Sequence, residues 1–110
     1  MQTSETFKHI NAEQVHQQLG NDDWVILDIR DPQSFANSRI HGAIHLTNDN
    51  LSDFVRNADL DKPTVICCYH GISSQQAANY LVSLDFSEVY SLDGGFEHWL
   101  KHYPDAIDVG

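Results

Sequence analysis

Short apolar runs alternate with helix-like patterns along the chain, and this alternation constrains the fold more than any other feature. The run Trp24–Ile29 is apolar except for Asp28 and rich in β-branched residues, which is typical of a strand buried on both faces. Thr64–Cys67 has the same character. Strands that alternate with helices form mainly parallel sheets. We therefore expect an α/β fold in which a five-stranded, mainly parallel sheet carries helices on both faces.

Turn and capping residues set the expected element boundaries. Strands are expected at 7–10, 24–29, 42–46, 64–67 and 88–92. Asn11 is the expected N-cap of a helix that ends near Leu19, and Asp31-Pro32 the expected start of a short helix to 37. Further helices are expected at 48–58, 74–84 and 96–103, with a turn at Gly94-Gly95. A chain of 110 residues suits one domain, 1–110, with a core of about 7–103.

The charge and the composition exclude several classes of partner. A net charge of −10 argues against nucleic acid and anionic membrane surfaces. No apolar run is long enough for a transmembrane helix, and the N-terminus has no signal-peptide pattern. The two cysteines are adjacent, so a disulfide framework is impossible, and reduced thiols in the cytoplasm are expected.

A cysteine lies where a buried strand gives way to a helix. Cys68 directly follows the run Thr64–Cys67, and a helical pattern begins at Ser74 after a short loop. In parallel sheets, ligands bind beyond the carboxyl ends of the strands. Free amides and the positive end of a helix dipole lower the pKa of a thiol and attract anions. This position therefore suits a nucleophilic sulfur.

The residues themselves leave rival interpretations of the two cysteines. Cys67, inside the strand, is expected to be a core residue, since neighbouring strand side chains point to opposite faces. Cys68 could also be a small buried hydrophobe. A cysteine-dependent phosphatase is disfavoured because the stretch 69–76 contains no arginine or lysine to clamp a phosphoryl group. Metal binding and thioredoxin-like redox chemistry lack the required ligand or Cys-x-x-Cys spacing around Cys68, so no metal is expected.

Four motifs follow one another along the chain. They are Leu27-Asp28-Ile29-Arg30 with Ser34-Phe35, Ile40-His41-Gly42-Ala43-Ile44-His45-Leu46, Cys68-Tyr69-His70-Gly71-Ile72-Ser73-Ser74 with Ala77, Ala78 and Leu81, and Val89-Tyr90-Ser91-Leu92-Asp93-Gly94-Gly95-Phe96 with Trp99. Each motif alone would be weak, but their order and spacing are specific. Over about residues 7–100 the chain resembles the rhodanese family, and within it the small bacterial thiosulfate sulfurtransferases of the GlpE type.

The resemblance implies an enzyme that moves the sulfane sulfur of thiosulfate. Cys68 would attack the outer sulfur, release sulfite and hold a persulfide, which a cyanide ion or a dithiol such as a thioredoxin-like protein would discharge. No cofactor is implied. The implied binding loop uses backbone N–H groups that stabilise the anionic sulfur. Its residues are Tyr69, His70, Gly71, Ile72, Ser73 and Ser74.

Loop length and departures from the family pattern refine this expectation. The loop from Cys68 to Ser73 has six residues, as in sulfur-handling members, whereas related phosphatases have a longer loop that ends in arginine. Many family members carry arginine at the position of Ser73, so the sulfur donor of this chain is less defined. A persulfide carrier that is charged by a protein donor, and a non-catalytic binding module, remain the alternatives.

Four further side chains have open roles. Asp28 and Arg30 end a strand at the ligand edge, and we expect them to support the site, with Arg30 ion-paired and ordering the neighbouring loops. Arg39 is either a surface residue or a cation near an anionic donor. His70 is either a solvent-facing loop residue or a group that acts on leaving sulfite.

Overall fold

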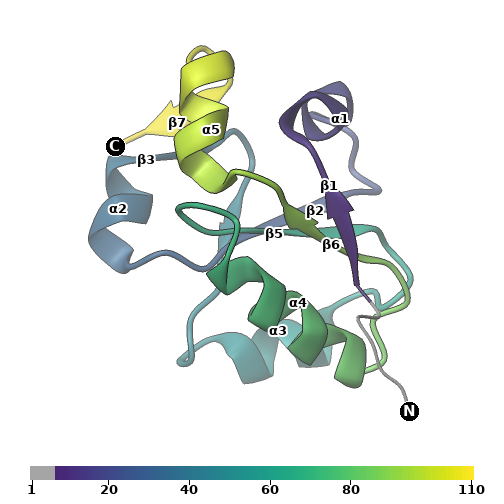
Figure 1. Cartoon of the computed structure of the whole chain (residues 1–110). Helices are drawn as coiled ribbons and strands as arrows, with labels where there is room; N and C mark the ends of the chain where they lie inside the picture. Colours follow the sequence, from purple (N-terminus) through teal and green to yellow (C-terminus); the bar gives the residue numbers. More distant parts are fainter. Residues whose placement is uncertain (1–6) are drawn as a thin grey trace.

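A five-stranded parallel sheet runs through the middle of the molecule (Figure 1). The computed structural model describes residues 7–110. The strand order is β1-β6-β5-β2-β4, and every neighbouring pair is parallel. The strands are β1 (Lys8–Ile10), β2 (Val25–Asp28), β4 (Ile44–His45), β5 (Thr64–Cys67) and β6 (Val89–Leu92). The expected α/β architecture is thus confirmed, with β5 as the central strand.

Helices cover both faces of this sheet (Figure 1). Helices α1 (Ala12–Gln17) and α5 (Gly95–His102) lie on one face, and α3 (Leu51–Asn57) and α4 (Ser73–Ser83) on the other. Alternate residues of β5 point into two separate cores, because successive strand side chains face opposite sides. Val65 and Cys67 belong to the core under α1 and α5, and Ile66 to the core under α4. Cys67 is fully buried there, as the sequence predicted.

A second, two-stranded sheet was not predicted from the sequence. The short α2 (Pro32–Asn37) runs directly into β3 (Ser38–Ile40), which pairs antiparallel with β7 (Ile107–Val109). Each segment is only three residues long, which is too short for a strand pattern to stand out, and the pairing joins segments far apart in the sequence. Side chains add to it, since His41 Nδ1 lies 2.7 Å from Asp108 Oδ1.

Capping residues set the starts of α1 and α2 as predicted. Asn11 and Asp31 both accept a hydrogen bond from the amide three residues on, and Pro32 begins α2. The helix expected from 48 begins only at Leu51, because Thr47 and Asn50 exchange side-chain hydrogen bonds with each other's amides and hold a turn. The last helix begins one residue early, at Gly95.

Candidate active site

Cys68 lies at the carboxyl end of the central strand, directly before the loop that leads into α4. Cys68 is only 4% exposed to solvent, so its thiol is buried beneath the loop. The loop, helix α4 behind it and the start of α5 meet at this edge of the sheet (Figure 1). The fold therefore brings Cys68 to the edge at which parallel sheets bind ligands.

Backbone amides cradle the Cys68 sulfur. The amides of Gly71 and Ser74 donate to Sγ over 3.1 and 3.3 Å. Gly71 has a φ of +85°, which the curl of the loop requires and which favours glycine. Burial raises the pKa of Cys68, but hydrogen bonds from the Ser74 side chain and from the amides of Ser74, Gly71 and His70 outweigh it and lower the pKa. Cys68 thus ionises more readily than an ordinary cysteine to the thiolate, which is the nucleophilic form.

The beginning of α5 holds the outer side of the loop. The amide of Phe96 donates to the carbonyl of Cys68 over 2.8 Å, and that of Glu97 to the carbonyl of Tyr69 over 3.1 Å. With these carbonyls turned toward α5, the loop amides are left to face the sulfur. The sequence predicted a turn at Gly94-Gly95 but not these two backbone contacts, because they join segments that are distant in the chain.

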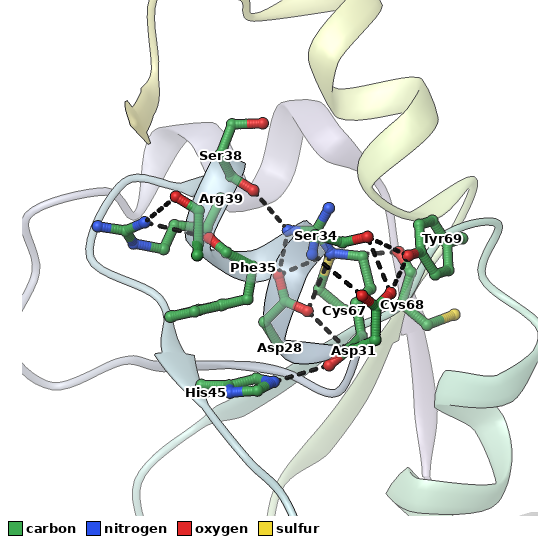
Figure 2. A network of polar contacts seen from close by, with 12 residues as sticks. Asp28, Asp31, Ser34, Phe35, Ser38, Arg39, His45, Cys67, Cys68 and Tyr69 are labelled. Carbon is green, nitrogen blue, oxygen red and sulfur yellow. Dashed lines mark hydrogen bonds and ion pairs between the residues drawn. The ribbon is translucent and has the colours of Figure 1, made fainter. Parts of the chain in front are cut away.

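Tyr69 ties the loop to α2. Its hydroxyl donates to the carboxylate of Asp31 and also contacts the hydroxyl of Ser34 (Figure 2). The hydrogen bond from Tyr69 is the largest cause that lowers the pKa of Asp31 from 3.8 to about 2, and hydrogen bonds from Ser34 add to it. The sequence identified Asp31 as an N-cap, but only the fold brings it to Tyr69.

A buried ion pair between Asp28 and Arg30 lies next to Tyr69, whose ring centre is 5.7 Å from the guanidinium carbon of Arg30. Arg30 Nη2 lies 2.8 Å from Asp28 Oδ2, and Arg30 Nε lies 3.0 Å from each carboxylate oxygen. The same guanidinium donates to the carbonyl of Ser38 over 2.7 Å and lies 4.1 Å from the centre of the Phe96 ring. Arg30 therefore connects β2, β3 and α5 rather than presenting a free charge to a ligand.

The other side chains of the loop point outward. His70 is exposed and lies 3.0 Å from the carboxylate of Glu97 on α5. Ile72 is 73% exposed, and Tyr69 is 43% exposed. Ser73 begins α4. Outside the loop, Arg39 of β3 donates to the carbonyl of Phe35 and lies over the Phe35 ring.

An open groove adjoins this site. Its volume is about 860 Å³, and its lining includes Ser73, at the end of the Cys68–Ser74 loop, and Arg30, just after β2, but not Cys68 itself. Its floor and walls come from α3, α4 and the loop after β4, including Leu46, Leu51 and Tyr80. Residues 7–110 contain no group of three or more histidine, cysteine or acidic side chains arranged to hold a metal ion. Among the helices in the same part of the chain, none has the length and hydropathy to cross a membrane.

Comparisons with known proteins agree with the fold. The model of the rhodanese-like domain family matches residues 11–102. The thiosulfate sulfurtransferase GlpE of Stutzerimonas stutzeri is 57% identical over 93% of both chains, and the protein of that name from Pseudomonas aeruginosa is 54% identical over 97% of this chain and 96% of its own. The rhodanese-like domain of the Anabaena protein Alr3790 superposes with a TM-score of 0.80 at 23% identity, over 93% of this chain and 79% of that chain.

Proposed function

Because the chain belongs to the rhodanese-like domain family, we propose that it is a thiosulfate sulfurtransferase that carries sulfur as a persulfide on Cys68. The observation that carries the proposal is the position of the Cys68 sulfur, buried between the amides of Gly71 and Ser74. Relatives at 54–58% identity bear the name thiosulfate sulfurtransferase. We propose that the chain acts as one domain, in the cytoplasm, where its two free thiols would stay reduced.

The reaction takes place in two displacements at sulfur. The Cys68 thiolate attacks the outer sulfur of thiosulfate, and the sulfur–sulfur bond of the donor breaks as sulfite leaves with its electron pair. The enzyme then holds a Cys68 persulfide. A nucleophilic acceptor attacks the outer sulfur of this persulfide, the new sulfur–sulfur bond breaks, and the Cys68 thiolate is restored. Cyanide leaves as thiocyanate, and the thiolate of a dithiol leaves as a persulfide.

The loop amides supply the electrostatic part of the mechanism. The backbone amides of Gly71, Ser74 and His70 surround the sulfur of Cys68. They would stabilise the negative charge both of the thiolate and of the persulfide anion. Preorganised donors of this kind cost no reorganisation during the reaction, and loss of one costs about 3 kcal/mol in related oxyanion sites.

The same geometry disfavours phosphoryl transfer. The stretch 69–76 contains no arginine or lysine, and the nearby guanidinium of Arg30 is held by the carboxylate of Asp28. A phosphatase loop needs such a cation to clamp the phosphoryl oxygens. Hydrolysis of p-nitrophenyl phosphate is therefore expected to be negligible.

One observation favours a protein as the natural partner in sulfur transfer. The rim of the loop is formed by exposed Ile72 and half-exposed Tyr69, which would pack on a protein surface better than on a small anion. A persulfide carrier that exchanges sulfur with protein thiols is thus the second candidate function. A non-catalytic binding module is disfavoured because the cysteine and its cradle are intact.

The test measures thiocyanate formed from thiosulfate and cyanide. The wild-type protein and Cys67→Ala should be active, whereas Cys68→Ser should be inactive. Incubation with thiosulfate alone should add one sulfur atom to the mass of the wild type and of Cys67→Ala only. A folded wild-type protein with neither activity nor added sulfur would overturn the proposal. Charging by a persulfidated protein without turnover of thiosulfate would establish the carrier instead.

A further inference from the structure

Two buried serine hydroxyls lie behind the Cys68 thiol. Ser74 in the first turn of α4 and Ser91 in β6 are both fully buried, and their Oγ atoms lie 2.7 Å apart. In the sheet, Ser91 is opposite Ile66 of β5, two residues before the cysteine. Because neither hydroxyl reaches water, each must find its hydrogen-bond partners within the protein.

Ser74 lies against the sulfur as well as against Ser91. Its amide donates to Cys68 Sγ over 3.3 Å, and a hydrogen bond from its side chain is among the causes that lower the pKa of this thiol. A serine hydroxyl has one hydrogen but can accept on its oxygen. When the Ser74 hydrogen points at a thiolate, the hydrogen between the two serines must therefore come from Ser91.

Charged side chains around the loop are engaged with one another. His70 of the loop pairs with Glu97 of α5, and Arg30 pairs with Asp28 at the end of β2. The carboxylate of Asp31 on the α2 side is hydrogen-bonded by Tyr69, and Asp93 after β6 pairs with His9 of β1. Neutral donors, rather than a neighbouring cation, therefore stabilise the thiolate.

We propose that Ser91 is a positioning residue for the nucleophile: its hydroxyl donates to Ser74 Oγ and so keeps the Ser74 hydrogen directed at Cys68 Sγ. When the thiol is neutral, the direction of these hydrogen bonds reverses, since the S–H then donates to Ser74 Oγ and Ser74 donates to Ser91. Ionisation of Cys68 thus reorients two hydroxyls while the heavy atoms stay in place. The importance of Ser91 for sulfur transfer rests on the proposed role of Cys68.

The test is the pH profile of alkylation of Cys68 by iodoacetamide, with fragment masses that separate Cys68 from Cys67. Ser91→Ala should raise the midpoint of this profile by about half a pH unit. Below the midpoint, this shift leaves about threefold less of Cys68 as thiolate. Ser91→Thr keeps a hydroxyl and should restore the wild-type midpoint. Thr64→Val is the matched control, since Thr64 on β5 is also buried and its hydroxyl donates to Lys62.

A double-mutant cycle separates this role from a purely structural one. Ser74→Ala should raise the midpoint further, and adding Ser91→Ala to it should change nothing, because Ser91 acts only through Ser74. If Ser91→Ala does not fold, Ser91→Cys, with its weaker donor, takes its place. An unchanged midpoint, or an equal shift with and without Ser74, would overturn the proposal. Because alkylation needs no thiosulfate, its result is independent of whether the protein transfers sulfur.

Discussion

Gly95 approaches Cys68 so closely that a Cβ atom at Gly95 would lie 2.5 Å from the Cys68 carbonyl oxygen. No real Cβ contact is this short, so either the loop or the start of α5 would have to move. The amide of Phe96, one residue on, donates to the same carbonyl. Contact between these two segments therefore fixes the orientation of the loop that follows Cys68.

Gly95→Ala should accordingly damage the amide cradle. We expect sulfur-transfer activity to fall by about tenfold or more, since displaced donors no longer face the sulfur. Gly20→Ala is the control: Gly20 has a similar positive φ but open space around its Cβ position. Gly20→Ala should therefore show the backbone strain of about 1–2 kcal/mol alone, without the steric clash. Full activity of Gly95→Ala would show that the loop does not depend on this contact.

The two cysteines should differ sharply in reactivity. The donors around Cys68 lower its pKa, whereas burial raises that of Cys67 well above its ordinary value, and the negative charge of Asp28 adds to this. Alkylation of the wild-type protein should modify Cys68 with a midpoint below the usual thiol value of about 8.5 and leave Cys67 unmodified until unfolding. Peptide mass mapping across a pH series measures both in one sample. A midpoint for Cys68 at the ordinary value would contradict the role assigned to the cradle.

The hydrogen bond between Tyr69 and Asp31 should make stability depend on pH in the acid range. Because the pKa of Asp31 is lowered from 3.8 to about 2, its stabilising effect is present above about 3.8 and is lost as the pH falls toward about 2. Tyr69→Phe should lower the midpoint of urea unfolding at neutral pH, and the difference from wild type should shrink toward the acid end of this window. Tyr80→Phe, at a half-exposed tyrosine on α4, should show no such pH dependence. A constant difference for Tyr69→Phe at all pH values would rule out the linkage.

The buried pair of Asp28 and Arg30 should be costly to break from one side. Asp28→Asn leaves the guanidinium of Arg30 buried without its counter-charge, and we expect a loss of about 3 kcal/mol in the free energy of unfolding. Asp53→Asn, which breaks the exposed pair with Arg56, should cost less than about 1 kcal/mol. Denaturant unfolding measures both. The double replacement Asp28→Leu with Arg30→Met should be less destabilised than Asp28→Asn, and the reverse order would show that the pair itself contributes more than its burial costs.

Local signals were sufficient for most elements of the fold. Buried β-branched runs identify β2 and β5, and Asn11 and Asp31 mark helix starts through hydrogen bonds to amides three residues away. Strands β3 and β7 were not predicted because each is three residues long and pairs with a strand far away in the sequence. Such pairing depends on which segments the fold places together rather than on the periodicity of either one.

For the site, the thiol and the elements around it can be recognised from local patterns: a cysteine that ends a buried strand, a glycine that lets the loop curl, and a helix that begins behind them. The contacts that complete the site form only when the chain folds. Ser91 reaches Ser74, Tyr69 reaches Asp31, and the start of α5 reaches the carbonyl of Cys68. The reason is that hydrogen bonds act over about 3 Å, and residues far apart in the chain come that close only when the sheet and its helices pack.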